Sequence, residues 1–365
     1  MEIRDLAPGL KCIAVPESKF KTRIIRFYLR SDLDEDITAR NLISAIISRG
    51  TRSYPNLQEL NAKLDSLYGA AFVKNVDKVG DWQVTSFALS VVNEKYLPEP
   101  SSLLPEAMAL LKEILFDPAR EDGIFVKSAF EGEKENIRRA LENQISDKAS
   151  YALLRLTQYM FEGEPYGKNI LGRKEDLDAL TREELWDKYL SWVRTAPATV
   201  VIGGEVDGAD VESLLSFLVE YRQEPARVRD LTFLSPPERV REYVEEMDVQ
   251  QGKLCMGFRH GAVIGDEALV GIEVATALLG GFPHAKLFQK VRERESLAYS
   301  VSASYDETKG VLFVMAGIDA DSYERVKQIV LESVEEISKG KFTLEELNAT
   351  KAGLIRRLNA VRDSM

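Results

Sequence analysis

The same order of predicted elements occurs twice along this chain of 365 residues. Alternating apolar and polar residues predict strands, and apolar residues three and four positions apart predict helices. In the first copy, a strand, two helices, two strands and a helix are predicted at residues 22–29, 37–48, 57–67, 71–79, 82–92 and 103–115. A long helical pattern over residues 125–159 follows them. Such a repeat favours two similar folding units over one large core.

The second copy has the same order. Its predicted elements are a strand, two helices, paired strands and a helix at residues 254–258, 266–279, 285–294, 299–318 and 322–338. A last helix begins at the capping box of Thr343 and Glu346. We therefore expect an α+β fold of two tandem homologous domains, each an antiparallel sheet with packed helices.

The segment between the copies sets the expected domain boundaries. A capping box at Thr181 and Glu184 begins a helix, and a strand over 198–204 and a helix over 211–218 follow. The next stretch is rich in charge and proline and lacks sustained periodicity, which is typical of a linker. We predict a first domain over 1–220, a linker over 221–241 and a second domain over 242–365. The second copy stops where the first continues with a helix, a strand and a helix, so we expect its domain to be truncated at the C-terminus.

Composition excludes several classes of protein. The net charge of −11 argues against a nucleic-acid surface, which is normally basic. Two cysteines, Cys12 and Cys255, are too few and too far apart for a disulfide framework or a thiolate metal site. This low cysteine count fits a protein of a reducing compartment. No leader pattern and no long uncharged apolar stretch is present. We expect a cytoplasmic protein that binds neither nucleic acid nor membrane.

Arg292 and Tyr299 are the candidate functional residues. They lie seven positions apart, with Arg292 near the end of a predicted helix and Tyr299 at the start of a strand. A fixed guanidinium and a phenol can both donate hydrogen bonds to a peptide carbonyl or an oxyanion. From spacing alone, the alternative is that Arg292 pairs with a nearby glutamate and that Tyr299 packs against its neighbours.

The surrounding stretch, residues 279–301, resembles the signature in the C-terminal half-domain of the pitrilysin/insulinase-like zinc peptidases. These inverzincins include the mitochondrial processing peptidase. The resemblance extends through most of the chain and implies the metallopeptidase/LuxS-like fold. It also implies that Arg292 and Tyr299 help to hold substrate against a zinc-bound water.

The zinc motif of that family is degenerate here. Catalytic members carry His-x-x-Glu-His on the first helix, just before a Gly-Thr that here is Gly50-Thr51. Counting back places Asn41 and Ala45 at the histidine positions and Ser44 at the glutamate position. A methyl group binds no metal, an amide is a poor zinc ligand, and an unactivated hydroxyl is no base near neutral pH.

The remaining candidates for metal binding are no better. Ala140 falls at the position of the family's third ligand, a glutamate on the long helix. The two histidines, His260 and His284, lie in different predicted elements, and neither has a partner four residues away. We therefore interpret them as ordinary polar surface or loop residues and expect no cofactor in this chain.

The resemblance implies that a partner chain carries the zinc. In several bacterial and mitochondrial members, one chain holds the metal and a related chain keeps the substrate-side residues or the scaffold. Residues 147–151, 165–167 and 286–299 resemble the inactive-subunit branch linked with maturation of elongation factor P and of ribosomally made peptides. We therefore expect the non-catalytic subunit of a heterodimeric zinc endopeptidase that acts on unfolded peptide. A stand-alone peptide-binding scaffold and a purely structural subunit are the alternatives.

Overall fold

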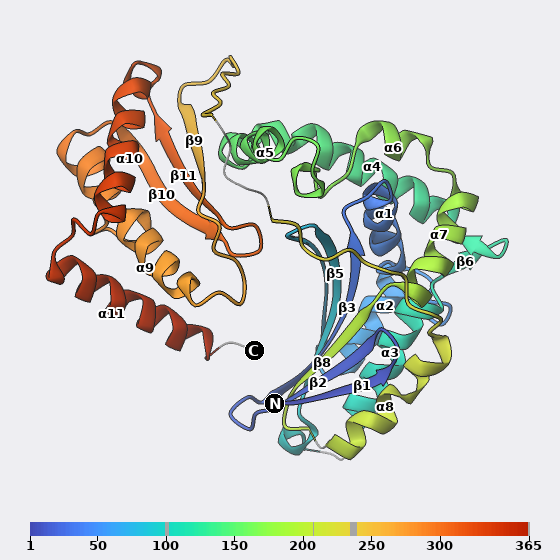
Figure 1. The fold of residues 1–365 in the computed structure, drawn as a ribbon. Coiled ribbons are helices and arrows are strands. Elements are labelled where there is room, and N and C mark those ends of the chain that lie inside the picture. The colour runs from blue at the N-terminus through green and yellow to red at the C-terminus, as the bar shows by residue number, and fades with distance from the viewer. Residues whose placement is uncertain (99–101, 207, 234–238, 364–365) are drawn as a thin grey trace. The chain divides into compact units, whose positions relative to one another are not determined.

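The structure is a computed structural model that describes residues 1–98, 102–206, 208–233 and 239–363 (Figure 1). The chain divides into two compact units, each built from two stretches of sequence. Unit 1 comprises Met1–Asn143 and Lys168–Asp230, and unit 2 comprises Gln144–Gly167 and the chain from Leu231 onwards. Residues 144–167 therefore pack with unit 2, although they lie within the range predicted for the first domain.

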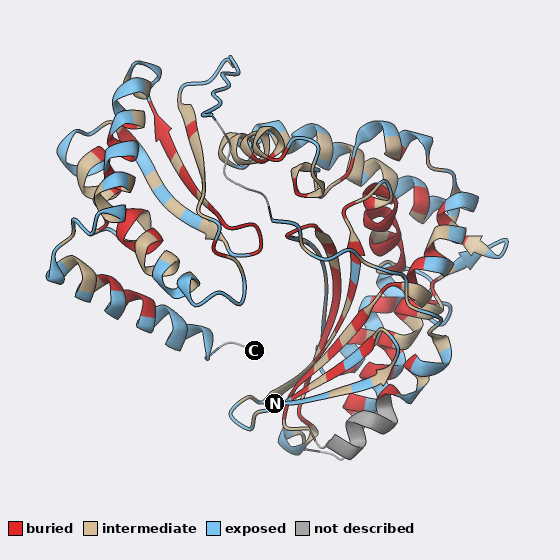
Figure 2. Cartoon of the chain, in the orientation of Figure 1, coloured by how far each residue is buried: buried red, intermediate tan, exposed pale blue. Residues whose placement is uncertain are grey.

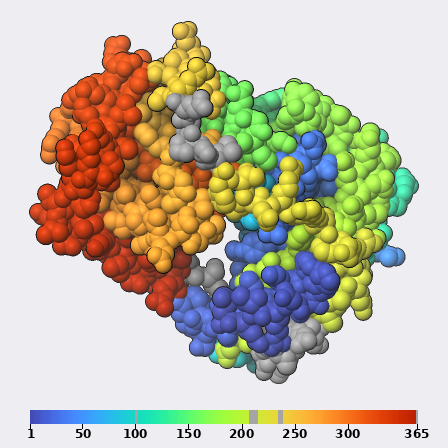
Figure 3. Space-filling model, in the orientation of Figure 1, coloured from blue at the N-terminus to red at the C-terminus, as the bar shows by residue number. Residues whose placement is uncertain are grey.

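Unit 1 is built on a six-stranded sheet in the order β1-β2-β8-β3-β5-β4. Neighbouring strands are antiparallel except for β2 and β8, which are parallel. The strands are β1 (Glu2–Ala7), β2 (Leu10–Pro16), β3 (Thr22–Asp32), β4 (Ala71–Val79), β5 (Trp82–Val92) and β8 (Ala198–Gly204). The two N-terminal strands lie at the surface (Figure 3), and β1 and β4 are the edges of the sheet.

The helices of unit 1 pack against one face of this sheet (Figure 1). Its α-helices are α1 (Ile37–Ile47), α2 (Leu57–Ser66), α3 (Leu103–Phe116), α4 (Lys127–Asn143), α6 (Lys174–Ala179), α7 (Arg182–Thr195) and α8 (Gly208–Tyr221). A short 3-10 helix, η1 (Glu94–Tyr96), and a small hairpin of β6 (Arg120–Glu121) and β7 (Ile124–Phe125) complete it. Alternate residues of the strands, such as Phe27 and Phe87, join the helices in one hydrophobic core. Figure 2 shows α1 as a largely buried helix of that core.

Unit 2 contains a three-stranded antiparallel sheet in the order β9-β11-β10. Its strands are β9 (Gly252–Arg259), β10 (Ala298–Asp306) and β11 (Val311–Ile318). Its helices are α5 (Lys148–Met160), α9 (Ala268–Gly280), α10 (Tyr323–Ser338), α11 (Leu344–Val361), a π-helix η4 (Phe288–Arg294) and the 3-10 helices η2 (Gln144–Ser146), η3 (Pro165–Gly167) and η5 (Ala320–Ser322). Leu287, Val291, Val314 and Val330 belong to its separate hydrophobic core.

The main strands of unit 1 and the strands of unit 2 follow one pairing order. In unit 1, β3 pairs with β5 and β5 pairs with β4, all antiparallel. In unit 2, β9 pairs with β11 and β11 pairs with β10, in the same sense. The first strand of each copy therefore pairs with the third, and the third pairs with the second. The two sheets are separate, and each has its own core.

The long helix predicted over residues 125–159 is wrong. The structure has two helices, α4 and α5, separated by the 3-10 turn η2. Asp147 caps α5, because its carboxylate accepts hydrogen bonds from the backbone amides of Ala149 and Ser150. A helix cannot continue through a residue whose extended backbone is fixed in this way. The break allows α4 to stay in unit 1 while α5 packs with unit 2.

Segment 144–167 is attached to unit 2 by a small apolar cluster. Phe161 and Tyr166 pack with Val311 and Phe313 of β11. A Cβ atom at Gly257 of β9 would lie 2.5 Å from the sulfur of Met160, so glycine allows α5 to approach the strand closely.

The other predicted elements agree with the structure to within a few residues. Both capping boxes are present, at Thr181 with Glu184 and at Thr343 with Glu346. Strands β1 and β2 were not predicted. Within the described ranges, no helix is long and apolar enough to cross a membrane.

Candidate functional site

The polar residues at the degenerate metal motif on α1 form hydrogen bonds with backbone carbonyls. Asn41 is buried, and its side-chain amide donates to the carbonyl oxygens of Ile37 at 3.0 Å and Ile170 at 2.7 Å. Ser44 is fully buried, and its hydroxyl donates to the Asn41 carbonyl at 2.8 Å. Ala45 lies one turn beyond Asn41 on the same face. The donors of both polar side chains are therefore used by backbone carbonyls.

Charged side chains lie beside this face. Arg49, one turn beyond Ala45, forms an ion pair with Glu133 of α4. Lys74 extends from the edge strand β4, and burial lowers the pKa of its ammonium group while the nearby Glu133 carboxylate partly opposes that shift. We call Arg49, Lys74 and Glu133 the charged triad. It supplies one carboxylate and two cations, a combination that repels a metal ion.

The rest of the predicted metal positions also fail as ligands. Ala140 is exposed on α4, seven residues after Glu133. Burial raises the pKa of the Cys255 thiol to about 11 and also raises that of Cys12, so neither is a thiolate at neutral pH. Among the residues that the structure describes, no three His, Cys, Asp or Glu side chains are grouped so that they could hold a metal ion.

The two histidines have local roles. His260 follows β9, and its Nδ1 accepts a hydrogen bond from the backbone amide of Ala262 at 3.2 Å. Burial lowers the pKa of His260, which keeps the ring neutral. The Nε2 of His284 lies 2.9 Å from the hydroxyl of Thr350, and its ring stacks on Phe282. Both histidines are partly buried rather than on the open surface.

Arg292 lies on η4, where the helix widens to π geometry. Its guanidinium stands 4.8 Å from the centre of the Phe288 ring, and the side chain is exposed. Glu295, three positions after Arg292, forms an ion pair with Arg325 at 2.5 Å. No described carboxylate pairs with Arg292. The alternative in which Arg292 binds a neighbouring glutamate is therefore not what the structure shows.

Tyr299 is placed by an irregular connection between η4 and β10. Ser296 has a φ of 52°, in the left-handed region that non-glycine residues rarely adopt, and the amide of Leu297 returns to the carbonyl of Val291 at 2.8 Å. The pairing of β10 with β11 then shifts between Ala298 and Ser300, so that Tyr299 is the extra residue of a bulge. Tyr299 is 66 % exposed and has no described hydrogen-bond partner, so it does not pack into the core.

This geometry presents two free donors from one edge of unit 2. Strand β10 is an edge strand of its sheet. A π-helix, a left-handed non-glycine residue and a bulge within twelve positions are unusual, and such features gather at functional sites. The sequence named Arg292 and Tyr299 as candidates, but it gave no sign of Phe288, whose ring lies beside Arg292, or of the positive φ at Ser296.

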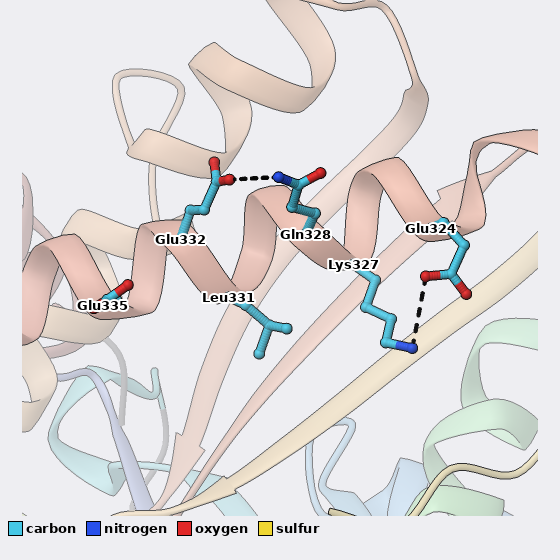
Figure 4. A pocket seen from close by; sticks show the side chains of 6 residues that line it. All are labelled: Glu324, Lys327, Gln328, Leu331, Glu332 and Glu335. Carbon is cyan, nitrogen blue, oxygen red and sulfur yellow. Dashed lines mark hydrogen bonds and ion pairs between the residues drawn. The ribbon is translucent and has the colours of Figure 1, made fainter.

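A hollow on the outer side of α10 is the other surface feature that could be considered as a site (Figure 4). Its lining comes from one helix, with Lys327 paired to Glu324 at 3.8 Å and Gln328 bonded to Glu332 at 2.8 Å. A site needs walls from several elements to enclose a ligand, and this hollow lacks them.

Comparison with known proteins places these observations in a family. Residues 179–354 match the family described as the peptidase M16 inactive domain. A probable inactive metalloprotease of Bacillus subtilis, YmfF, is 32% identical over 352 residues, which cover 96% of this chain and 83% of YmfF. The chain belongs to the M16 peptidase family.

Solved structures agree with this assignment. A conserved protein from Enterococcus faecalis V583 has a TM-score of 0.92 and 30% identity, over 100% of this chain and 86% of that one. An M16 inactive domain from Pseudomonas fluorescens has a TM-score of 0.82 and 17% identity, over 98% of this chain and 84% of that one. The α+β fold is therefore that of M16 inactive-domain proteins, as the resemblance around Arg292 and Tyr299 predicted.

The zinc of M16 metallopeptidases does not fit the residues of this chain. The position between α1 and α4 contains an amide bonded to carbonyls, a methyl group and the charged triad. A zinc ion needs three or four nitrogen, sulfur or carboxylate ligands that point at one place. The chain is accordingly a homologue of inactive M16 metalloproteases.

Proposed function

We propose that this chain is the zinc-less subunit of a heterodimeric zinc endopeptidase. In this proposal, a related chain carries the metal site, and Arg292 and Tyr299 bind the peptide substrate and stabilise the oxyanion. The substrate is an unfolded peptide or a precursor that is cut during maturation. The similarity to YmfF and the sequence resemblance to the branch linked with elongation factor P and ribosomally made peptides support this role.

One observation carries the proposal. Arg292 and Tyr299 are both exposed and lack described hydrogen-bond or ion-pair partners, although their positions are fixed by the π-helix, by Ser296 and by the bulge. Backbone irregularities of this kind cost roughly 1–3 kcal/mol each. If Arg292 and Tyr299 had only a structural role, a regular helix and a regular strand could hold them without this cost.

The chemistry follows from the two side chains. A guanidinium carries a permanent positive charge and several donors, and a neutral phenol adds one donor. Both can donate to the carbonyl oxygen of the bond that is cut, whose negative charge grows as water attacks. A donor that is fixed in place for this charge contributes typically about 3 kcal/mol to the lowering of the barrier.

The test is to reconstitute the heterodimer from this chain and a zinc-bearing relative from the same organism. We expect Tyr299→Phe and Arg292→Ala to lower kcat for a quenched fluorescent peptide by roughly a hundredfold or more. Binding of the two chains to each other should change little. The matched controls are Arg294→Ala on the same helix and Tyr305→Phe on the same strand, for which turnover should stay close to that of the wild type.

The alternative outcome is equally clear. If the Tyr299 and Arg292 variants cleave the peptide at the normal rate, the pair is structural. The chain would then act as a peptide-binding or structural scaffold with no part in catalysis. Metal analysis of the separated chains is expected to find zinc with the partner alone, and zinc bound tightly to this chain would contradict the proposal.

A further inference from the structure

The face of the six-stranded sheet that carries no helices is the most distinctive unassigned surface of unit 1. Helices cover the other face, where Phe27, Phe87 and Val200 enter the core. Because side chains alternate along a strand, the intervening residues of β1, β2, β3, β4, β5 and β8 share the uncovered face. The register brings Arg26 beside Val201 on one side and Ala88 on the other, and it places Tyr28 between Thr199 and Ser86.

Two arginines and two aromatic rings stand on this face. Arg26 donates to the hydroxyl of Tyr28 at 3.2 Å. The guanidinium of Arg30 lies 4.5 Å from the centre of the Trp82 ring, and the indole nitrogen of Trp82 donates to the Arg229 carbonyl at 2.7 Å. We call Arg26, Tyr28, Arg30 and Trp82 the arginine row. The residues beside Arg26 and Tyr28 on β5 and β8 have short side chains, so the row is the projecting part of the face.

The positive charge of the row is not neutralised within unit 1. No described carboxylate forms an ion pair with Arg26 or Arg30. Of the acids on the same face, Asp32 pairs with Arg229 at 3.0 Å and Asp5 pairs with Lys11 at 3.9 Å, whereas Asp77 of the edge strand β4 is exposed and forms no described ion pair. Such an arrangement is unexpected in a protein with a net charge of −11, whose other surfaces are rich in carboxylates.

Apolar side chains flank the row on the same face. Val73 and Val79 of the edge strand β4 are exposed. Ile3 of β1 and Val15 of β2, near the other edge of the sheet, are exposed as well. Asn75 and Asp77 stand between Val73 and Val79 on β4, so this margin offers separate apolar contacts and not a continuous apolar patch. The face therefore combines central cations with apolar margins.

We propose that this face binds an extended acidic peptide with apolar side chains. The inference rests on the proposed peptidase function and names its substrate class. Guanidinium groups bind carboxylates through paired hydrogen bonds, and Arg26 and Arg30 have donors left for this purpose. Val73 and Val79 contact the apolar residues of the peptide. A nucleic acid is disfavoured, because two cations on an acidic protein neutralise too little of its phosphate charge.

The experiment uses the full chain alone, without a partner, so it does not depend on peptide cleavage. Fluorescein-labelled unstructured peptides of one length are compared, in which leucine alternates with Glu, Gln or Lys. We expect the Glu peptide to bind most tightly by fluorescence anisotropy, and we expect added salt to weaken its binding. The double variant Arg26→Gln/Arg30→Gln should raise its Kd about tenfold or more.

The matched control is the double variant Arg52→Gln/Arg139→Gln, which removes two exposed arginines elsewhere in unit 1 and should leave Kd unchanged. Circular dichroism should show that both double variants are folded. Equal binding of the Glu and Lys peptides, or an unchanged Kd in the Arg26/Arg30 variant, would overturn the proposal. A single-stranded oligonucleotide that binds more tightly than the Glu peptide would also overturn it. The same holds for a dimer of this chain that dissociates when Arg26 and Arg30 are replaced.

The outcome is separable from that of the proposed function. Loss of turnover in the Tyr299 variant with unchanged binding in the Arg26/Arg30 variant would retain the split enzyme and reject the acidic-peptide face. The reverse result would retain the face and reject the catalytic role of Tyr299.

Discussion

At the scale of single residues, the former metal position has been rebuilt rather than left empty. Asn41 bridges α1 to the carbonyl of Ile170, a contact across 129 positions of sequence that fixes the loop before α6. A histidine at this position would have to give up that bridge to bind a metal. The ion pair of Arg49 with Glu133 joins the segment just after α1 to α4. The region has become a structural contact between helices.

Lys74 gives this rebuilt region a measurable pH dependence. Burial lowers its pKa in the folded state, whereas the unfolded chain keeps the ordinary value near 10.4. Between these two values the unfolded state binds more protons, so the free energy of unfolding rises with pH. In Lys74→Met this rise should be absent, and stability at pH 7 should increase by an amount of the order of 1 kcal/mol.

The measurement is urea unfolding across neutral and alkaline pH. Lys127→Met, which removes an exposed lysine at the start of α4, is the control and should retain the pH-dependent rise. If Lys74→Met unfolds at lower urea concentration than the wild type at pH 7, the ammonium is stabilising and our account of it is wrong.

The sequence predicted only part of this residue-level picture. Arg292 and Tyr299 could be named as candidates because both lie in one short stretch. The charged triad could not, because Arg49 follows α1 while Lys74 and Glu133 lie on β4 and α4, and no local pattern links them. That Asn41, Ser44 and Ala45 occupy the positions of the zinc motif is a property of the sequence itself.

At the scale of elements, the connection from η4 to β10 combines several irregular backbone features in one short stretch. The backbone amide of Glu295 donates a hydrogen bond to the carbonyl of Lys290, five positions back. The amide of Leu297 donates to the carbonyl of Val291. Ser296 between them must adopt a positive φ to reverse the chain. The bulge then turns Tyr299 out of the regular alternation of β10.

This connection can be tested through Ser296. Ser296→Gly removes the left-handed penalty and should raise the free energy of unfolding by about 0.5–1 kcal/mol. Ser296→Val adds a branched side chain to a positive φ and should lower it by roughly 1–2 kcal/mol. Because a shifted connection moves Tyr299, the valine variant should also lower turnover of the reconstituted heterodimer.

Ser300→Val on the neighbouring exposed strand position is the control, since valine suits an extended backbone. Its stability by guanidinium unfolding should equal or exceed that of the wild type. Equal losses in the valine variants at positions 296 and 300 would show that the positive φ of Ser296 is not the cause.

Local pattern explains which elements the sequence could predict. Strands β4 and β5 were predicted to the residue, because their alternation is uninterrupted between clear turns. The break between α4 and α5 was hidden, because Ile137, Leu141 and Ile145 continue the helical spacing through it. Strand β2 was missed although its hairpin partner β1 is adjacent in the sequence, and its other partner, β8, lies almost two hundred residues away.

At the scale of the whole molecule, two copies of one strand order are joined by a chain that crosses between units more than once. Residues 1–143 belong to unit 1, residues 144–167 to unit 2, residues 168–230 to unit 1 again, and the remainder to unit 2. A simple linker between two independent domains would cross once. A segment inserted within the sequence of unit 1 therefore packs with unit 2, through its own small apolar cluster.

This arrangement predicts that unit 1 cannot be produced cleanly by cutting the chain at its linker. In a fragment of residues 1–230, the apolar residues Phe161 and Tyr166 lose Val311 and Phe313, which complete their cluster in unit 2. We expect that fragment to bind an apolar dye and to aggregate, because the segment is left with a bare apolar face. Replacing residues 144–167 of the fragment by a short Gly/Ser linker should give a monomer that binds little dye and unfolds cooperatively, since the core of unit 1 is intact. Dye binding and sedimentation compare the two fragments directly, and equal aggregation of both would show that residues 144–167 are not the exposed segment.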